Sequence, residues 1–487
     1  MVDSWTTEKE PPDANNLTIA VIGGGGREWV PKITMDLALA GDLHGEVRLF
    51  DINPESAERN AKFGNWVSAH EEATTEWSYQ AFTDRAAALD GADFVFTSTQ
   101  YNPAETNAKD LEITKKYGIL HPVTHSVGPG GHARSMRQIP VYRAFGEAIK
   151  KHCPDAWVFN YSNPMTTITR SLYDAYPEIN ALGFCHEVGG FKSELVSLIE
   201  KYLDPAHTPK REEIEVDITG INHFTWLTAA NWQGVDLFSL VDHHIEQPGT
   251  VRVFSDEEMS SESYFVDNQQ VTYELYRRFG ALPAAGDRHL AEFSPWFVRG
   301  EDPSALHRWG IRRTPASYRR KHWQDVDSAQ DYRVDRLMED PDDFVIERSH
   351  EVAVESIRAL CGGEPFITSV NLPNVGQAPD LPRNAVVETN VRLSGNTVTP
   401  LVAGELPPAV RNLVRLHIEN QELLIEADGD LDVAFQAFLN DPQVMGLHLD
   451  RAQEMFCELM EAHRDYLEEW DFSASVMEEP LPDHAQH

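Results

Sequence analysis

The segment LTIAVIGGGG (residues 17–26) decides the fold of this chain. It is a short apolar run, rich in β-branched residues, that ends in a cluster of glycines. These glycines are Gly23, Gly24, Gly25 and Gly26. A helical pattern over residues 31–40 follows, and EVRLFD (residues 46–51) has the character of a second strand that ends in an acid. Strand, glycine turn, helix and acidic strand end together form the arrangement that binds dinucleotides.

The acid at the end of the second strand indicates which dinucleotide binds. In this arrangement backbone amides face the pyrophosphate, and a carboxylate bonds the ribose. We therefore expect NAD at the glycine turn, with Asp51 and the nearby Asn53 beside it. Asp51 favours NAD over NADP because a carboxylate repels a 2′-phosphate. The third glycine of the GxGxxG pattern is absent, since Glu28 stands in its place.

Further strands alternate with helical segments and predict the rest of the sheet. Residues 93–98, 156–160 and 181–185 have the apolar character of buried strands. This alternation predicts an α/β fold with a doubly wound, Rossmann-type parallel sheet, whose ligands lie beyond the carboxyl ends of the strands. Asn163 and Cys185 fall at such ends and should share a cleft with the cofactor.

The chain is long enough for more than one domain, with 487 residues of which 41% are apolar. Residues 1–16 are polar and are expected to form a disordered tail. Residues 17–204 should form the NAD-binding Rossmann-like domain. Residues 205–487, with a mixed pattern and longer helical stretches, should form an α+β substrate, metal and C-terminal domain.

Composition and charge exclude several classes of function. No run approaches the roughly 18 apolar residues of a membrane helix, and the four cysteines are scattered without a CxxC pair, which fits a reducing cytoplasm. The formal charge of −37 opposes nucleic-acid binding because it repels phosphates. The dispersed acidic residues suggest a halophilic source, with an ordinary acidic enzyme as the alternative.

Two segments offer candidate metal ligands. ALGFCHEVGG (residues 181–190) places a thiol, an imidazole and a carboxylate before two glycines, and GINHFTW (residues 220–226) places another histidine beside an amide. Cys185 and His223, if brought together, would make half of a metal site. The alternative is that Cys185 is a buried small hydrophobe and His186 an ordinary core histidine.

Two more segments are rich in glycine and ionisable groups. VGPGGHAR (residues 127–134) is expected to be a loop that leads into a helix, where Arg134 and Arg137 give a reason for an anion to bind. Residues 280–293 hold a dense group of ionisable side chains after a glycine–proline loop.

Together these motifs resemble glycoside hydrolase family 4 over nearly the whole chain, about residues 17–468. The resemblance rests on several separate matches in the right order. The matching segments are the glycine turn at 23–26, Gly-Pro-Gly-Gly at 128–131 with Arg134, Asn163-Pro-Met, Cys185-His186, Asn222-His223, Asn371-Leu-Pro-Asn374 and Val386-Val-Glu388. His186-Glu187-Val188, in place of the aspartate of α-glucosidase-like members, is similar to the α-galacturonidase branch, as is the segment at 283–289.

The resemblance implies a fold like lactate and malate dehydrogenases and a redox-assisted elimination outside the two-carboxylate scheme of ordinary glycosidases. In such a reaction NAD⁺ takes a hydride from C3 of the sugar, a base removes the C2 proton, the C1–O bond breaks, and water and the hydride then return. Cys185 and His223 would hold a divalent metal as Lewis acid. The family uses Mn²⁺, although thiolate and imidazole alone would suit Zn²⁺ or Fe²⁺ better. Asn163 and Asn222 would bind the sugar.

The resemblance leaves the proton-transfer groups open. Several members carry a tyrosine base in the region of residues 276–292, where this chain offers Tyr276, Asp287 and His289. We expect Asp287 to be the base, with His289 in the catalytic group, and His186 to be the acid for the leaving group.

The carboxylate of a uronic acid glycoside needs a cationic partner. Arg134 or Arg288 is a candidate bidentate clamp, and a salt bridge between Arg288 and Glu292 is the alternative for the second.

We therefore expect a cytoplasmic, homo-oligomeric glycosidase, dimer or tetramer, that hydrolyses α-linked galacturonides with NAD and Mn²⁺ or another divalent metal. An α-galactosidase or α-glucuronidase of the same family is the nearest alternative. An NAD-dependent hydroxy-acid dehydrogenase would give Cys185 and His223 no role, and a non-catalytic NAD-sensing protein would not need them.

Overall fold

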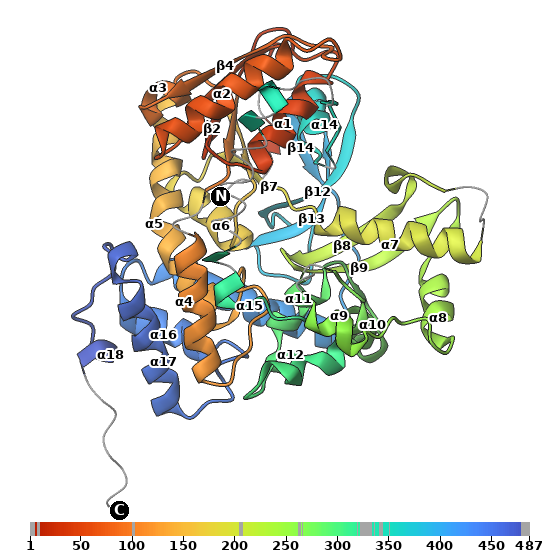
Figure 1. The fold of residues 1–487 in the computed structure, drawn as a ribbon, viewed down its shortest axis with the longest axis vertical. Helices are drawn as coiled ribbons and strands as arrows, with labels where there is room; N and C mark the ends of the chain where they lie inside the picture. Colours follow the sequence, from red (N-terminus) through yellow and green to blue (C-terminus); the bar gives the residue numbers. More distant parts are fainter. Residues whose placement is uncertain are drawn as a thin grey trace, which may run out of the picture.

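A computed structural model of the protein describes most of the chain (Figure 1). The described residues are 5–6, 10–99, 103–203, 208–261, 264, 266–318, 320–321, 334–335, 337–339, 344–349 and 351–478.

A large sheet organises the molecule, and six of its neighbouring strands run parallel in the order β4-β3-β2-β5-β6-β7. This is the strand order of doubly wound dinucleotide-binding folds, so the predicted fold class is confirmed. The strands are β2 (Leu17–Ile22), β3 (Gly45–Phe50), β4 (Trp77–Phe82), β5 (Phe94–Thr97), β6 (Trp157–Asn160) and β7 (Asn180–Gly183).

Helices cover both faces of this sheet, which explains why its central strands β5 and β6 are buried along their whole length. Alternate residues of β2 contact opposite layers: Val21 packs in the core with Leu37 of α1, and Ile22 packs in the core with Ile168 of α6. One layer contains α1 (Trp29–Ala38), α2 (Pro54–Ser68) and α14 (Ala353–Leu360). The other contains α3 (Arg85–Leu89), α5 (Gly128–His152) and α6 (Met165–Ala175).

The C-terminal half of the chain completes the same sheet. Beyond β7 the order continues as β12-β13-β14-β1 with antiparallel pairing, and Asn371 of β12 lies opposite Gly183 of β7. The strands are β12 (Phe366–Pro373), β13 (Val386–Leu393), β14 (Thr397–Pro400) and β1 (Trp5–Thr6). The two expected domains therefore share one sheet, and the expected boundary at 204 and 205 lies outside the described residues.

The expectation of a disordered tail over residues 1–16 is wrong for Trp5 and Thr6, which pair with Val398 and Thr397 of β14. The edge of a sheet offers unpaired backbone groups to any chain segment that reaches it. This pairing depends on the backbone, so the polar sequence of the segment did not reveal it.

A smaller antiparallel sheet lies against the large one, where the side chain of Asn390 in β13 donates to the carbonyl oxygen of Val216 in β8 at 2.6 Å. Its strands pair in the order β10-β9-β11, with β8 also paired to β9. They are β8 (Glu215–Ile221), β9 (Phe224–Trp232), β10 (Val235–Asp236) and β11 (Leu282–Pro283). The helices near it are α7 (Glu187–Tyr202), α8 (Phe238–Glu246), α9 (Asp256–Ser260), α10 (Gln270–Phe279), α11 (Asp287–Leu290) and α12 (Pro295–Val298). Among them run 3-10 turns at Arg211–Glu213, Ala291–Phe293 and Pro303–Trp309.

A group of helices at the lower left of Figure 1 closes the structure around α4 and α5. Phe438, Met455 and Phe456 form its apolar centre with Met136 of α5. The elements are α4 (Pro103–Lys116), α15 (Pro408–Glu426), α16 (Leu431–Leu439), α17 (Leu449–Ala462), α18 (Ser475–Glu478) and a 3-10 turn at Arg464–Tyr466. None of the helices in the described ranges is long and apolar enough to cross a membrane.

The Gly-Pro-Gly-Gly segment is the start of a helix, and the expectation of a loop is wrong there. α5 begins at Gly128, with Pro129 in its first turn, where a missing N–H costs nothing. The anion partner expected for Arg137 is a carboxylate of the protein itself. Its guanidinium bonds the buried Asp110 carboxylate of α4 at 2.7 and 3.2 Å, and His463 bonds the same carboxylate at 2.7 Å.

This buried network yields a prediction about stability. Asp110, Arg137 and His463 are each at most 2% exposed. Burial raises the pKa of Asp110, but Arg137 and the contact with His463 lower it to about 2. Asp110→Ala should lower the free energy of unfolding by about 3–5 kcal/mol, because it leaves a buried guanidinium without its partner. Urea unfolding measures this. The exposed pair of Glu461 and Arg464 is the control, and Glu461→Ala should change stability by under about 1 kcal/mol.

Equal losses in the two variants would contradict the structural role of the Asp110 network.

Candidate functional site

The glycine turn after β2 has the close backbone packing that a dinucleotide site requires. Gly23 has φ +94°, and a Cβ there would lie 2.1 Å from the carbonyl oxygen of Ser98. A Cβ at Gly24 would lie 2.7 Å from Leu49. No side chain can therefore stand at these positions, and the backbone is left bare toward the carboxyl ends of the strands. The turn fits the NAD site expected from the sequence.

Asp51 and Asn53, both expected to touch the cofactor, also shape this region. The Asp51 carboxylate accepts hydrogen bonds from the backbone N–H of Gly25 and of Asn53, both at 2.9 Å. The Asn53 side chain accepts from Ser56 N–H at 3.4 Å as the N-cap of α2, with Pro54 next to it. Asp51 thus fixes the glycine turn, while Asn53 has a helix-capping role that accounts for its position without a ligand.

The two expected metal ligands come from different sheets. Cys185 follows β7 and precedes α7, as the sequence indicated. His223 occupies, with Asn222, the two-residue turn between β8 and β9. Its φ of +64° is one that side chains rarely adopt, and such turns usually place glycine there. A histidine held in that conformation indicates a function that outweighs the local strain.

The environment of this pair holds both ligands neutral when no cation is present. Burial, with Glu388 and Glu187 nearby, raises the pKa of the Cys185 thiol well above its usual value. Burial, with His289 nearby, lowers the pKa of His223 well below its usual value. Ser126 Oγ lies 2.8 Å from His223 Nδ1, so Nε2 is the ring nitrogen left for a ligand.

The donor set fits a metal that is shared with a substrate. Within the described part of the chain no three His, Cys, Asp or Glu side chains converge as a closed metal site. A thiol and an imidazole leave most of the coordination sphere of a metal open, as catalytic sites do. Asn222, which is buried next to His223, adds a polar side chain beside Cys185 and Glu388.

A pocket of about 370 Å³ opens next to these residues and has the size of small-molecule sites. Three expected site residues, His186, Arg288 and His289, lie in its wall. Its lining residues are Val123, His125, His186, Glu187, Gly190, Phe191, Asp267, Gln269, Ala285, Gly286, Arg288 and His289. A larger hollow of about 1010 Å³ between α3 and α5 includes none of the expected site residues, so size alone does not locate the site.

Glu187 is a central residue of this pocket to which the sequence assigned no role. Its Oε1 lies 3.6 Å from His186 Nε2 and 3.8 Å from His289 Nε2, and its Oε2 accepts from Gly286 N–H at 2.7 Å. The His289 ring also stacks on His223 with 3.8 Å between ring centres. The sequence signal that could have pointed to Glu187 is its position directly after Cys185-His186.

Asp287, which was expected to be the base, lies outside the pocket wall. Its carboxylate accepts from the backbone N–H of Val271 and Thr272 at 3.0 and 2.8 Å and from the Thr272 hydroxyl at 2.9 Å. It therefore anchors the start of α10. Asp267 lines the pocket instead, and sequence reasoning missed it because it precedes the segment at 280–293.

Arg134 and Arg288, the two candidate clamps, have different surroundings. Arg134 is buried in α5, where its guanidinium donates to Asn107 Oδ1 and to the carbonyl oxygen of Asn163, each at 3.2 Å. It thereby holds Asn163 at the end of β6. Arg288 lines the pocket and donates to Pro122 O and Thr314 Oγ1 at 2.7 and 2.6 Å.

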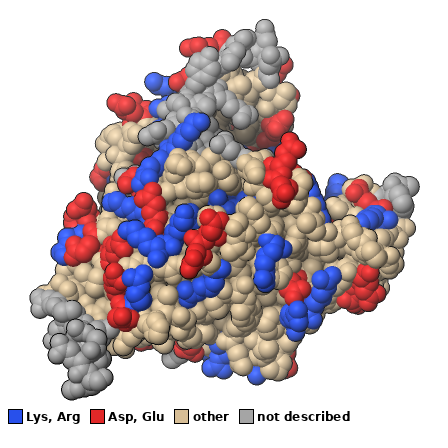
Figure 2. Space-filling model, turned by 60° about the horizontal axis from the view of Figure 1, so that its bottom comes forward, with Lys and Arg blue, Asp and Glu red and all other residues tan. Residues whose placement is uncertain are grey.

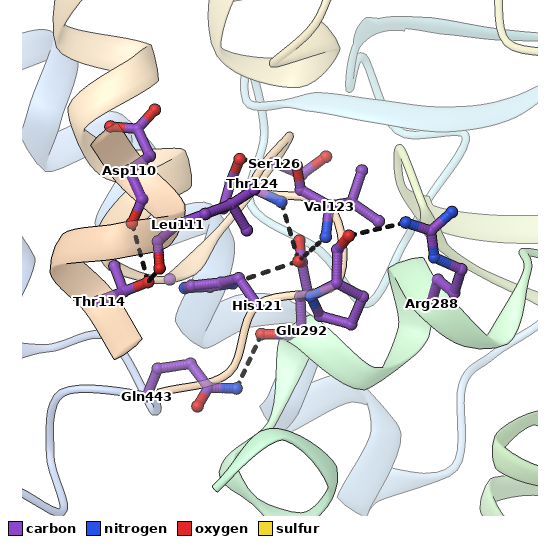
Figure 3. Close-up of polar contacts among 12 residues, drawn as sticks. Asp110, Leu111, Thr114, His121, Val123, Thr124, Ser126, Arg288, Glu292 and Gln443 are labelled. Carbon is purple, nitrogen blue, oxygen red and sulfur yellow. Dashed lines mark hydrogen bonds and ion pairs between the residues drawn. The ribbon is translucent and has the colours of Figure 1, made fainter. Parts of the chain in front are cut away.

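Arg288 and Glu292, the alternative salt-bridge pair, each bond to the loop at residues 121–124. Glu292 lies 3.2 Å from the His121 ring and accepts two backbone hydrogen bonds from Val123 and Thr124, whereas Arg288 reaches the same loop at Pro122 (Figure 3).

Glu388 is a second residue to which the sequence assigned no role. It lies opposite Asn371 on the neighbouring strand, whose amide donates to it at 3.0 Å, and it also bonds the Thr225 hydroxyl. It is 1% exposed, and burial raises its pKa to about 7.

This raised pKa predicts a pH dependence of stability in the metal-free protein. Below about pH 4.5 the Glu388 carboxyl is protonated in folded and unfolded chains alike. Between there and pH 7 the unfolded chain loses the proton first, so the carboxyl increasingly disfavours folding. Glu388→Gln, which resembles the protonated acid, should gain about 3 kcal/mol over the wild type between pH 4.5 and 8. Chemical unfolding with a chelator present measures it, and a difference that does not change with pH would refute the assignment.

Comparisons with known proteins agree with this geometry. The sequence model of family 4 glycosyl hydrolases matches residues 18–201, and that of their C-terminal domain matches residues 218–444. An α-galacturonidase of Thermoanaerobacterium saccharolyticum is 38% identical, covering 94% of this chain and 98% of the relative. An α-galacturonidase of Bacillus subtilis is 35% identical over 92% and 97%.

Solved structures share the fold. The crystal structure of lplD from Bacillus subtilis, 34% identical, has a TM-score of 0.82 and covers 91% of this chain and 100% of that one. A 6-phospho-α-glucosidase from gut microorganisms in complex with NAD and Mn²⁺, 19% identical, has a TM-score of 0.77 with 94% and 100% covered. The extent of these matches, over both halves of the sheet, establishes that the chain belongs to family 4 of the glycosyl hydrolases.

Proposed function

We propose that this protein hydrolyses α-linked galacturonides. The observation that carries the proposal is the pocket whose wall holds His186 directly after Cys185, His289 stacked on His223, and Arg288. The α-galacturonidases that are 34–38% identical over nearly the whole chain support this substrate class.

NAD and a divalent metal, with Mn²⁺ the first candidate, are the proposed cofactors. A 6-phospho-α-glucosidase of the same fold holds both NAD and Mn²⁺, which supports the assignment. When bound, NAD supplies a reversible hydride acceptor and the metal a Lewis acid for sugar oxygens. The glycine turn and Asp51 would hold the first, and Cys185 and His223 the second.

The proton-transfer roles fall to groups around Glu187. His186, whose side chain is 72% exposed at the pocket, is proposed as the acid for the leaving group. Of the base candidates, His289 lies in the pocket beside His223, whereas Asp287 is engaged by α10. We favour His289, because the Asp267 carboxylate of the same wall accepts from the backbone N–H groups of Gln269 and Asp287. Glu187, between the two histidines, would keep both rings oriented.

Arg288 is the proposed partner of the uronate carboxylate. The protein's charge of −37 repels an anion at long range, but those distant charges are screened beyond about 10 Å at ordinary salt. A charge-assisted pair within the pocket is worth about 1.5–3 kcal/mol. The local arginine therefore outweighs the overall field.

The acidic surface and the free cysteines support a salt-rich, reducing cytoplasm as the compartment of this enzyme. The four cysteines form no disulfide, which fits a reducing cytoplasm. Acidic and basic side chains lie intermingled on the face in Figure 2, and acids exceed bases by 37 in the sequence. We infer adaptation to a salt-rich cytoplasm, and a homo-oligomeric assembly as in the sequence-based expectation.

The substrate assay compares matched aryl α-galacturonide and α-galactoside with catalytic NAD⁺, MnCl₂ and a thiol reductant. The galacturonide should be turned over without accumulation of NADH, with kcat/KM about tenfold to hundredfold above that of the galactoside. Cys185→Ser should abolish metal-dependent turnover, whereas Cys457→Ser in α17 should not. Stoichiometric NADH would indicate a dehydrogenase, and equal use of both glycosides would indicate an α-galactosidase.

Arginine variants test the clamp separately from the reaction. Arg288→Ala should bring the galacturonide-to-galactoside ratio of kcat/KM close to one, because only the charged substrate loses a partner. Arg134→Ala should lower both rates together, since it supports Asn163. Arg308→Ala, at an exposed arginine, is the control and should change neither. An unchanged ratio in Arg288→Ala would remove Arg288 from substrate recognition.

A further inference from the structure

The metal-ligand candidate His223 is contacted by a buried loop, residues 121–126, that no step of the proposed reaction uses. Ser126 at the end of this loop is the residue whose hydroxyl lies 2.8 Å from His223 Nδ1. Ser126 is 9% exposed and His223 is 3% exposed, so water has little access to compete for this contact.

An imidazole that binds a metal through one nitrogen needs its other nitrogen to carry the proton. With Nδ1 against Ser126, only Nε2 can serve as the ligand. If the Ser126 oxygen accepts from Nδ1–H, the Nε2 lone pair is free. If Nδ1 were instead the acceptor, Nε2 would carry the proton and could not bind a metal. The role of the serine in this hydrogen bond thus determines which tautomer His223 adopts and whether its Nε2 can bind a metal.

The loop that carries Ser126 is fixed from the side of the second sheet. Glu292, itself 1% exposed, accepts from Val123 N–H and Thr124 N–H at 2.7 and 2.9 Å and lies 3.2 Å from the His121 ring (Figure 3). Although burial raises it, the His121 ring and these amides hold the pKa of Glu292 below its usual value. A buried carboxylate with three partners is costly to displace, so it sets the path of the loop.

The first turn of α5 fixes the loop from the other side. A Cβ at Gly128 would lie 2.3 Å from His121 Cε1, and one at Gly131 would lie 2.7 Å from the backbone carbon of Ser126. Glycine is therefore required for the helix to pack this closely on the loop. The Gly-Pro-Gly-Gly segment, which was expected to form a loop, instead packs as the first turn of a helix against residues 121–126.

From this arrangement we infer that Ser126 is a positioning residue for His223, held in place by Glu292 and the glycines of α5, and that its oxygen accepts the Nδ1 proton so that Nε2 is available to the metal. The inference rests on the proposed function in one respect, that His223 ligates a metal. It assigns no contact between Ser126 and substrate.

The first test measures Mn²⁺ binding to the NAD-loaded protein by titration calorimetry with MnCl₂ under a thiol reductant. Ser126→Ala should raise the Kd for Mn²⁺ about 10–100-fold, the usual cost of losing a ligand's outer partner. Ser126→Thr, which keeps the hydroxyl, should stay near the wild type. Ser171→Ala removes another buried serine hydroxyl, in α6, and is the matched control.

The second test needs neither metal nor substrate. Nitrogen NMR of histidine-labelled, metal-free protein, with His223→Asn to assign the signal, reports which ring nitrogen carries the proton. The wild type should show the Nδ1–H form, and Ser126→Ala should show a shift toward Nε2–H. Ser126→Cys, which nearly keeps the volume but accepts weakly, gives the same readout if the alanine variant does not fold.

The outcomes separate the two proposals. Wild-type protein without galacturonide turnover would overturn the proposed function but leave the tautomer result intact. An unchanged Kd for Mn²⁺ and an unchanged tautomer in Ser126→Ala would overturn the positioning role of Ser126 alone.

Discussion

The antiparallel pairing of β12 with β7 is the contact on which the site depends. It joins the C-terminal half of the chain to the last parallel strand, with Asn371 opposite Gly183. A Cβ at Gly183 would lie 3.0 Å from the Cβ of Asn371, so the two strands meet closely only because one residue is glycine. Cys185 follows β7 by two residues, and Glu388 is the cross-strand partner of Asn371. This single strand pair therefore sets a thiol from one half of the chain near a carboxyl from the other.

The same region is electrostatically prepared for a positive charge. Without a cation, burial favours the neutral thiol at Cys185, the neutral ring at His223 and the protonated carboxyl at Glu388. A divalent ion would reverse the preference at the thiol, because its charge stabilises the thiolate far more than water does. Metal binding should then release protons, and the affinity of the site for the metal should therefore depend on pH.

Sequence reasoning located the nucleotide-binding half well because its signals are local. The apolar run at residues 17–22, the glycines after it and Asp51 each follow from backbone requirements within a few residues. Cys185 and His223 stay predicted ligands, which the sequence suggested because a thiol and an imidazole follow apolar runs at predicted strand ends. The start of α5 was mistaken because glycines indicate a loop unless close packing from a distant segment, here residues 121–126, requires them.

Residues that act through distant partners left no local signal. Asp287 was a reasonable candidate for the base because it is a carboxylate in a segment rich in ionisable groups. Its helix-anchoring role depends on Thr272 lying within 3 Å, which the spacing along the chain does not reveal. The contacts of Glu187 with His289 and of Ser126 with His223 likewise join residues about 100 positions apart in the sequence. Long-range register, rather than residue type, was the missing information.

The short strand β1 has a consequence for assembly. By pairing with β14, Trp5 and Thr6 occupy part of the backbone edge that the large sheet would otherwise expose at that end. An open edge is a template on which a second chain can add a strand, so its occupation acts as a cap against uncontrolled growth of the sheet between molecules. Trp5 and Thr6 thus cover backbone groups of β14 that would otherwise be open to a strand of another molecule.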